Sequence, residues 1–392
     1  ADPFLKDAVK MSIGVGMIGC GAMGLSVAKL LLKESSEIQL RGLCDPLESS
    51  IKTCKEQLGV DAPIYDDYRQ LLAQKDIQWV LIASWNCHHF EQVMAAFDAG
   101  KHVFCQKPLG ITAEECSRMY HQWKKTNLKF NIGFTLRYSP HYRKINQLLR
   151  EGAIGDIISF EFNETLDFNH GGYIMGNWRR LKANAGTHLL EKCCHDLDLA
   201  NWMVASKPRR VASFGGLDFF TPANERHIDR IGRAKDNSQA YMTWDTDARP
   251  RPFLNPFTSD KDIIDNQVAI IEYENGIRAS FHCNSNTAIP ERRMYICGSE
   301  GTLRADVLTG LLEIKRIGFD TNIERIKTGH GEGHGHGDQV LAAELADSML
   351  NSGPVAASLE DGLYSAFTAF AIDEAMDTGK VVSLDKYYQM LK

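Results

Sequence analysis

Three glycines near the start of the chain have the spacing of a turn that binds phosphate groups. The segment Gly19-Cys-Gly21-Ala-Met-Gly24 lies between the apolar run Gly14–Ile18 and an apolar pattern with helical spacing. Gly19 permits a tight turn, Gly21 lets the backbone approach a pyrophosphate, and Gly24 lets the helix pack closely on the strand. The N–H groups at the start of that helix would face the anion. The pattern predicts a dinucleotide site, and a glycine-rich turn without a ligand is the alternative.

A carboxylate follows at the separation that a dinucleotide site requires. Asp45 ends a second apolar run, Ile38–Cys44, and lies about 20 residues beyond Gly24, where an acidic side chain can accept hydrogen bonds from the adenosine ribose. A carboxylate at this position would repel the 2′-phosphate of NADP. Asp45 therefore predicts NAD as the cofactor.

A second group of residues could move a proton. Glu191 and His195 are four residues apart, so on a helix they share one face, with Asp198 about one turn further along. A carboxylate one turn away can hold the imidazole and raise its pKa, which a general base near neutral pH requires. An ordinary contact on a helix surface is the alternative, and the spacing alone favours it.

A lysine next to a proline is the third candidate. Lys107 precedes Pro108 and follows the apolar run His102–Cys105. Proline restricts the preceding residue to extended conformations, which limits where the lysine can point. An ammonium group at this place could stabilise a developing alkoxide or assist proton transfer. A loop lysine without a function is the alternative.

Aromatic and cationic side chains upstream of Glu191 could contact a substrate. Trp178 could stack on the face of a sugar, although tryptophan is equally common in plain core positions. Arg179, Arg180 and Lys182 could bind hydroxyl groups or an anion, although we expect at least two of them to be solvated.

A late glycine-rich segment contains three histidines, His330, His334 and His336, and is followed by Asp338. Histidine-rich tracts can bind a metal. So many glycines give no rigid scaffold, however, and no cysteine lies nearby in the sequence. We therefore predict no metal site, and instead expect a flexible loop that ends in an N-cap at Asp338 and borders the substrate.

These residues need a scaffold, and residues 11–132 predict one. Strand-like and helix-like patterns alternate there, as in a doubly wound α/β domain whose parallel sheet is covered on both faces. The expected strands lie near Gly14–Ile18, Ile38–Cys44, Trp79–Ala83, His102–Cys105 and Phe130–Phe134. The expected helices are Ala22–Lys33, Leu47–Leu58, Asp67–Leu72, Phe90–Ala99 and Ala113–Thr126. Ligands bind beyond the carboxyl ends of such strands, so the segments after the third and fourth strands should border the cofactor.

Residues 133–392 have a different pattern and predict an α+β domain with an open, mostly antiparallel sheet. The strand candidates are Ile157–Phe162, Arg210–Phe214, Val268–Glu274, Arg278–Cys283, Arg292–Cys297 and Leu311–Ile317. The helix candidates are His141–Leu149, Thr187–Val204, Gln339–Leu350 and Leu359–Thr378. Asn275-Gly276 predicts a hairpin turn. The stretch Thr221–Asp265 lacks periodicity and predicts a long loop that serves as a lid or as an oligomer contact.

The totals agree with this division and exclude several classes of protein. A chain of 392 residues is too long for one ordinary core, and residues 1–10 are interpreted as a leader that precedes the two domains. The net charge of −6, without basic clusters, argues against nucleic acid, and the lack of a long apolar run argues against a membrane. Ten scattered cysteines are typical of free thiols in a reducing compartment, so we expect a cytoplasmic protein.

Taken together, the motifs resemble the glucose–fructose oxidoreductase, inositol dehydrogenase and rhizopine-catabolism family (Gfo/Idh/MocA), over almost the whole chain. Besides the glycine turn, the matching segments are Ser84-Trp85-Asn86-Cys-His-His89 for Thr-Pro-Asn-x-x-His, Gln106-Lys107-Pro108 for Glu-Lys-Pro, Gly133-Phe-Thr-Leu-Arg137-Tyr138, Glu191-x-x-x-His195 for Asp-x-x-x-His, and Gly337-Asp338. Gln106 and Glu191 depart from the family pattern, which leaves the identity of the reacting hydroxyl open.

The resemblance implies an NAD(P)-dependent dehydrogenase of sugars or cyclitols, with NAD favoured by Asp45. It makes Lys107 and His195 catalytic, with Glu191 as the supporting carboxylate. The implied cofactor contacts are Gly19, Gly21, Ala22, Met23, Gly24, Asp45, Ser84, Trp85, Asn86, His89, Gln106 and Lys107. The implied substrate contacts are Arg137, Tyr138, Trp178, Arg179 and His334. The resemblance also implies homodimers or homotetramers packed through the open sheet.

Three functions are compatible with these residues. The favoured one is the oxidation of a secondary hydroxyl of a sugar, glycoside or inositol. The second is a glycosidase that oxidises its substrate transiently with bound NAD. The third is a non-catalytic, NAD-binding sugar sensor, and the presence of both Lys107 and His195 counts against it.

Overall fold

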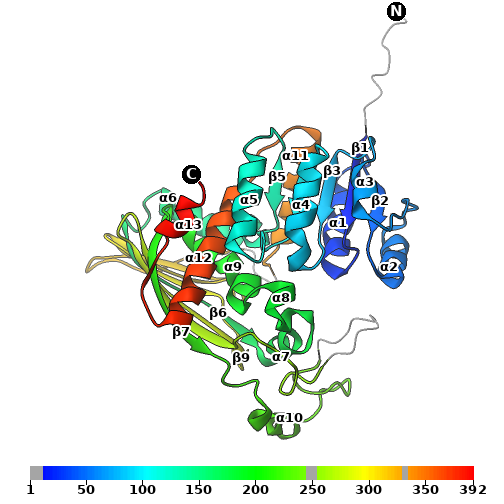
Figure 1. Cartoon of the computed structure of the whole chain (residues 1–392). Helices are drawn as coiled ribbons and strands as arrows, with labels where there is room; N and C mark the ends of the chain where they lie inside the picture. The colour runs from blue at the N-terminus through cyan, green and yellow to red at the C-terminus, as the bar shows by residue number, and fades with distance from the viewer. Residues whose placement is uncertain (1–11, 244–253, 329–333) are drawn as a thin grey trace, which may run out of the picture.

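The structure, a computed structural model, describes residues 12–243, 254–328 and 334–392 and contains two β-sheets (Figure 1). The first sheet is parallel and has the order β2-β1-β3-β4-β5. Its strands are β1 (Ile13–Ile18), β2 (Ile38–Cys44), β3 (Trp79–Ile82), β4 (His102–Cys105) and β5 (Phe130–Ile132). The predicted doubly wound parallel sheet is therefore confirmed. The expected leader, residues 1–10, lies outside the described residues.

The helices between these strands follow the predicted pattern closely. They are α1 (Ala22–Glu34), α2 (Glu48–Leu58), α3 (Tyr68–Leu72), η1 (Asn86–His88), α4 (His89–Asp98) and α5 (Ala113–Trp123). The start of α5 shows why local sequence sets such limits. The Thr112 hydroxyl accepts a hydrogen bond from the Glu115 N–H, and the Glu115 carboxylate accepts one from the Thr112 N–H.

The second sheet has nine strands in the order β13-β12-β11-β10-β6-β9-β8-β7-β14. Neighbouring strands are antiparallel except β6 and β9, which run parallel, so the predicted open, mostly antiparallel sheet is confirmed. The strands are β6 (Ile157–Asp167), β7 (Pro208–Gly216), β8 (Asn266–Tyr273), β9 (Arg278–Thr287), β10 (Arg293–Gly298), β11 (Gly301–Asp306), β12 (Leu311–Arg316), β13 (Glu324–Arg325) and β14 (Val382–Ser383). The predicted turn at Asn275-Gly276 joins β8 to β9, and Gly276 has a positive φ of 85°.

One face of the second sheet is covered by helices and the other is open. The helices of this half are η2 (Thr135–Tyr138), α6 (Pro140–Arg150), α7 (Phe168–Gly176), η3 (Trp178–Arg180), α8 (Lys182–Ala185), α9 (His188–Val204), α11 (Gly337–Leu350), α12 (Leu359–Thr378) and α13 (Asp385–Gln389). Figure 1 shows α12 lying across this sheet, and α9 packs between α12 and β6. Of the residues of α9, all but Lys192, Asn201 and Trp202 are buried. The helix α11 returns to the first domain and packs on α1.

The stretch predicted as a long loop, Thr221–Asp265, is more structured than expected where it is described. It contains η4 (Pro222–Asn224) and α10 (Arg226–Ile231), and residues 244–253 lie outside the described residues. Residues 217–220, which follow β7, and this stretch together form an aromatic lobe that packs on α7. Its side chains include Phe219, Phe220, Tyr241 and Phe257. The sequence missed this core because its aromatic residues have neither helical nor strand spacing.

Candidate active site

The glycine turn after β1 has the geometry that its sequence predicts. Gly19 has a positive φ of 91°, and a Cβ there would lie 2.5 Å from the backbone of Ala83 and Ser84. A Cβ on Gly24 would lie 2.2 Å from the carbonyl oxygen of Gly19. Both positions therefore require glycine, one for the turn and one for the close contact between helix and turn.

The start of α1 suits a phosphate group. Gly21 is the N-cap, and among the described residues no side chain caps the helix and no acidic residue stands in its first turn, which begins with Ala22 and Met23. Its N–H groups and the positive end of the helix dipole are available to an anion. Asp45 lies beside this turn, and its carboxylate accepts hydrogen bonds from the N–H groups of Cys20 and Leu47, both at 2.8 Å. The turn and Asp45 therefore fit a diphosphate joined to a ribose.

The segment after β3 acts partly as a scaffold, through two of the predicted cofactor contacts. His89 is completely buried, with Nδ1 2.7 Å from the carbonyl oxygen of Pro108 and Nε2 3.3 Å from that of Ser84. Burial lowers the pKa of His89 to about 4, so the ring is neutral and joins two loops. Asn86 donates to the carbonyl oxygen of Ala185 at 2.9 Å and so connects the two domains. Both side chains thus hold the loops together, while the Asn86 amide oxygen makes no hydrogen bond within the described structure.

The neighbouring predicted contacts have other partners. The Ser84 hydroxyl donates to the Gln92 amide oxygen at 2.7 Å. Gln106 is buried against Gly133, where a Cβ would lie 2.6 Å from the Gln106 amide oxygen. A glycine at position 133 thus lets Gln106 stay at the tip of β4, next to Lys107.

Lys107 connects the first domain to α9. It follows β4, and its peptide bond to Pro108 is cis. Its ammonium group donates to the backbone carbonyl of Glu191 and, at 3.1 Å, to the Glu191 carboxylate. The structure thus brings together two of the three predicted catalytic residues, from positions 84 residues apart in the chain.

Glu191 binds two cations and not the imidazole that we expected it to hold. Its Oε1 atom accepts from Lys107 at 3.1 Å and from Arg179 Nε at 3.0 Å. Burial disfavours the charged carboxylate, but the cations around it outweigh burial and hold the pKa of Glu191 well below its usual range. Glu191 is therefore ionised and fixes Lys107 and Arg179.

His195 is buried one turn further along α9, and its Nδ1 atom has no hydrogen-bond partner among the described residues. Burial, followed by the positive charge of Lys107, lowers the pKa of His195 well below its usual range. The expectation that a carboxylate raises this pKa is therefore wrong. His195 is a neutral imidazole, the form that can accept a proton.

The His334 ring lies 5.5 Å from the His195 ring, centroid to centroid, so the predicted loop does reach this place. His334 Nδ1 is 3.0 Å from the Asp338 carboxylate. The predicted N-cap at Asp338 is wrong, because α11 begins earlier, with His336 as its N-cap. His330 lies outside the described residues.

A stack of side chains from both domains stands beside Glu191. The rings of Trp85 and Trp178 are nearly parallel, 4.9 Å apart, and the Arg179 guanidinium lies 4.4 Å from the centre of the Trp178 ring. Arg179 also donates to the Tyr173 hydroxyl at 3.3 Å. Trp178 thus packs on protein groups. The neighbouring Arg180 donates to the Asp260 carboxylate, in the stretch Thr221–Asp265, at 2.6 Å.

Two predicted substrate contacts belong to the core. Arg137 donates to both oxygens of Asp198, at 2.7 and 2.8 Å, and to Asp361 at 2.8 Å. Tyr138 is buried, which raises its pKa above the usual value. The bonds of Arg137 give it a structural role inside the protein, and its contact with a substrate stays a prediction, as does that of Tyr138.

Sequence reasoning missed Tyr173 and the partner of Trp85. Tyr173 lies in a glycine-rich segment without a recognisable motif, so nothing pointed to it. Trp85 carried a signal, since it stands where the family pattern has a proline, but the pattern did not reveal that Trp178 would face it.

Comparison with known proteins identifies the chain. Residues 13–134 match the oxidoreductase family with an NAD-binding Rossmann fold, and residues 146–384 match the C-terminal α/β domain of that family. The chain belongs to the Gfo/Idh/MocA oxidoreductases. It is therefore an NAD-binding oxidoreductase, and the resemblance seen in its sequence motifs is confirmed.

Individual relatives are distant. The Bacillus subtilis protein YteT is 23% identical over 428 residues, covering 95% of this chain and 99% of the relative. An inositol 2-dehydrogenase/D-chiro-inositol 3-dehydrogenase of Lactiplantibacillus plantarum is 25% identical over 218 residues, covering 55% of this chain and 57% of that enzyme. The match thus spans little more than half the length of this second relative.

Solved structures share the fold of this Gfo/Idh/MocA member. Levoglucosan dehydrogenase in complex with NADH and levoglucosan has a TM-score of 0.78 at 22% identity, over 95% of this chain and 99% of that chain. Apo scyllo-inositol dehydrogenase from Lactobacillus casei has a TM-score of 0.73 at 23% identity, over 96% of this chain and 99% of that chain. In the described part of this chain, no helix is long and apolar enough to cross a membrane.

Proposed function

We propose that this protein oxidises a secondary hydroxyl of a sugar, glycoside or inositol with NAD. The observation that carries the proposal is the contact of Lys107, from the tip of β4, with Glu191, one turn before the buried His195 on α9. A cation and a neutral imidazole side by side are what the removal of a hydroxyl proton needs.

Each residue has a distinct role in this proposal. Neutral His195 accepts the hydroxyl proton, and the Lys107 ammonium binds the same oxygen and stabilises its developing negative charge. Glu191 and Arg179 hold Lys107 in place, so they are positioning residues. NAD, held by the glycine turn and Asp45, supplies the ring that accepts the hydride.

A polyhydroxylated ring is the substrate class that suits the surroundings. Two of the similar proteins are named for substrates of this kind, inositol and levoglucosan. In this chain Tyr173, Arg179 and His334 offer hydroxyl, guanidinium and imidazole groups next to Glu191 and His195. Such groups bind the hydroxyls of a cyclic polyol.

The protein is mixed with NAD and a panel of inositols, hexoses, uronates and glycosides, and the formation of NADH is measured by its absorbance. We expect turnover with at least one compound and its loss in the Lys107→Ala, His195→Ala double variant, by about a thousandfold or more in kcat/KM. Lys124→Ala, which removes an exposed lysine paired with Glu360, is the matched control and should keep full activity.

Other outcomes separate the alternatives. Cleavage of a glycoside without net NADH would support the glycosidase that oxidises its substrate transiently. Binding of NAD and of a sugar with no reaction at all would support the sensor. Equal activity in the double variant and the control would refute the roles given to Lys107 and His195.

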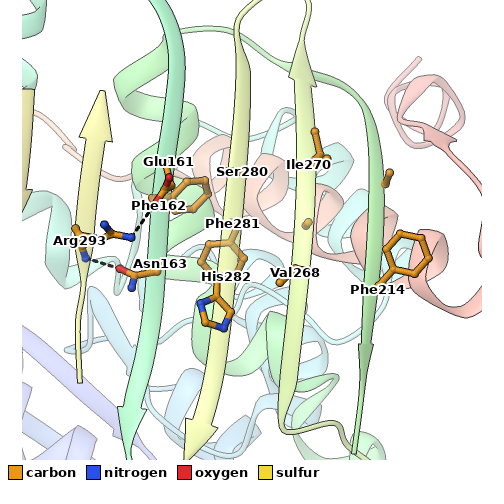
Figure 2. Close-up of a pocket in the computed structure, with 12 residues that line it drawn as sticks. Glu161, Phe162, Asn163, Phe214, Val268, Ile270, Ser280, Phe281, His282 and Arg293 are labelled. Carbon is orange, nitrogen blue, oxygen red and sulfur yellow. Dashed lines mark hydrogen bonds and ion pairs between the residues drawn. The ribbon is translucent and has the colours of Figure 1, made fainter. Parts of the chain in front are cut away.

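We also propose that two copies of the chain pair through the open face of the second sheet. Phe214, Val268 and Ile270 are 71%, 48% and 60% exposed on that face. They border a hollow of about 360 Å³ that also includes Phe162 and Arg293 (Figure 2). Several exposed apolar side chains that lie next to one another on a surface are typical of an interface between protein chains. Ten free cysteines suit a reducing compartment such as the cytoplasm for this assembly.

Analytical ultracentrifugation tests the pairing. We expect a dimer or tetramer for the wild type and a monomer for Phe214→Asp, Ile270→Asp. Ile317→Asp, which adds a charge at an equally exposed position after β12, should leave the assembly unchanged. A monomeric wild type would overturn the proposal.

A further inference from the structure

The helix that carries Glu191 and His195 also contributes to a cluster of metal-binding side chains on its sheet-facing side. His188 is the first residue of α9, Cys193 lies on the same helix, and Cys283 lies on β9. One ligand atom from each residue lies within 4.8 Å of the others, and all three residues are buried. The expectation that no metal binds rested on the glycine-rich histidine segment. Cys283 is 90 residues from Cys193, so their spacing in the sequence does not indicate a shared site, and only the fold brings them together.

The surrounding structure fixes each member of the cluster. Residues of β9 alternate between its two faces, which directs Cys283 and Ser285 to the buried side, where α9 packs. The Thr187 hydroxyl caps α9 by accepting from the Leu190 N–H at 3.2 Å, so the backbone of His188 is held. His188 Nε2 is 3.2 Å from the Ser285 hydroxyl, which orients the ring.

The donor set is that of a thiophilic cation. Two sulfurs and one imidazole are ligands that Zn²⁺ and Cu⁺ prefer, and Mg²⁺ and Ca²⁺ avoid. His188 is 2% exposed, yet its Nδ1 atom has no hydrogen-bond partner among the residues described. A buried polar atom without a partner is uncommon in a folded protein and marks a position that a ligand can satisfy.

Charge balance distinguishes the ions. A metal-bound cysteine is a thiolate, so each of the two cysteines gives up its proton when the cation binds. Zn²⁺ bound to two thiolates and a neutral imidazole forms an uncharged group, which a buried position tolerates.

We propose that His188, Cys193 and Cys283 bind a Zn²⁺ ion that joins α9 to β9. Binding releases the two thiol protons and forms two Zn–S bonds and one Zn–N bond, without any change of oxidation state. Two of the ligands, His188 and Cys193, flank Glu191 in the sequence. The ion therefore fixes the part of α9 that presents the Glu191 carboxylate to Lys107, and it takes no part in the hydride transfer.

The first measurement is the metal content of the purified, reduced wild-type protein by plasma mass spectrometry. We expect about one zinc per chain and little copper. We expect its loss in Cys193→Ser and in Cys283→Ser. Cys194→Ser is the matched control, because Cys194 is the next residue along the helix, is equally buried and lies outside the cluster. It should keep its zinc.

A second measurement uses only the wild type, in case a serine variant fails to fold. The protein is stripped with a chelator and refilled with Co²⁺, and the absorption band of thiolate-bound cobalt is recorded. We expect the band, together with a melting temperature that falls on stripping and recovers with Zn²⁺ but not with Mg²⁺.

Three results would overturn the proposal. One is a folded wild type that contains no zinc and takes up no Co²⁺. Another is copper in place of zinc, which would assign the cluster to Cu⁺. The last is a count of eight free thiols in denaturant, where ten are expected, with the missing pair mapped to Cys193 and Cys283 as a disulfide.

Discussion

Glu191 and Asp198 lie two turns apart on α9, and each carboxylate binds an arginine, but the two clusters are built differently. Asp198 binds Arg137, which also donates to Asp361 and to the carbonyl oxygen of Ala356. Each charge in that cluster is paired with an opposite charge, between a buried Asp198 and a half-buried Asp361. Glu191 divides one oxygen between Arg179 and Lys107, and the neighbouring imidazole, His195, lacks a partner at Nδ1 within the described structure.

The difference separates structural charge from charge that can do chemistry. A guanidinium that is bonded to two carboxylates and a backbone carbonyl mainly stabilises the contact between segments of the fold. An ammonium group bonded to one carboxylate, beside an unpartnered imidazole, can still bind a third group. The resemblance assigned both Arg137 and Lys107 to the site, and the groups that they bind are what distinguishes them: Arg137 joins two carboxylates, and Lys107 binds the one carboxylate next to His195.

Removing Arg137 should have the largest effect on stability. Arg137→Met leaves the buried Asp198 and the half-buried Asp361 without their cation, which we expect to lower the free energy of unfolding by about 3–5 kcal/mol. Arg143→Met is the control. Arg143 binds Glu344 where both side chains are about one-third exposed, and its loss should cost about 1 kcal/mol or less.

Denaturant unfolding monitors both variants, and the activity of the folded fraction is measured alongside. We expect that activity to be unchanged in Arg137→Met. A loss of activity without a loss of stability would return Arg137 to the substrate site and remove the contrast between the clusters.

Shortening the carboxylate at position 191 should affect the reaction more than the fold. Glu191→Asp withdraws the carboxylate by one methylene from Lys107 and Arg179, so Lys107 loses its fixed position. A displacement of about 1 Å costs on the order of 100-fold in rate, which we expect in kcat with little change in KM. Glu344→Asp shortens an exposed pair in the same way and should change neither constant.

A positioning role predicts this division between kcat and KM, and a purely structural role does not. If Glu191→Asp instead lowers the unfolding free energy by as much as Arg137→Met and leaves kcat intact, the two clusters are alike.

The sequence predicted the scaffold well because local patterns set it. The strands β1, β2 and β4 start and end within one residue of their predicted limits, since apolar runs and glycine turns are short-range features. Lys107, Glu191 and His195 were predicted for the same reason, through motifs that a few adjacent residues define.

What the sequence did not reveal depends on distant partners. The Glu191 carboxylate has His195 within reach on its own helix, and only the folded chain shows that Lys107 and Arg179 take it instead. Likewise, Arg137 reads as a site residue until Asp361, 224 residues away, is seen to bind it. Spacing along one helix cannot report competition from other elements.

Asp373 extends the comparison to a third buried carboxylate next to α9, one that has no cation partner among the described residues. It accepts hydrogen bonds from the Thr187 hydroxyl at 2.5 Å and from Gln267 at 3.2 Å. Burial raises its pKa to about 6, above its value of about 3.9 in an unfolded chain. The folded state therefore binds this proton more tightly, so its contribution to stability is present below about pH 4 and is lost as the pH rises through about 6.

Asp373→Asn keeps the shape of the protonated acid and removes the titration. Relative to wild type, the variant should gain about 2 kcal/mol of unfolding free energy between pH 4.5 and pH 8, measured as the change in the difference between the two proteins. Asp229→Asn, at an exposed position on α10, is the control and should show no such change. A difference that is constant with pH, or that shrinks as the pH rises, would mean that Asp373 is ionised in the fold. A buried carboxylate of this protein could then stay charged with hydrogen bonds alone, and the cations around Glu191 would not be needed to keep that group ionised.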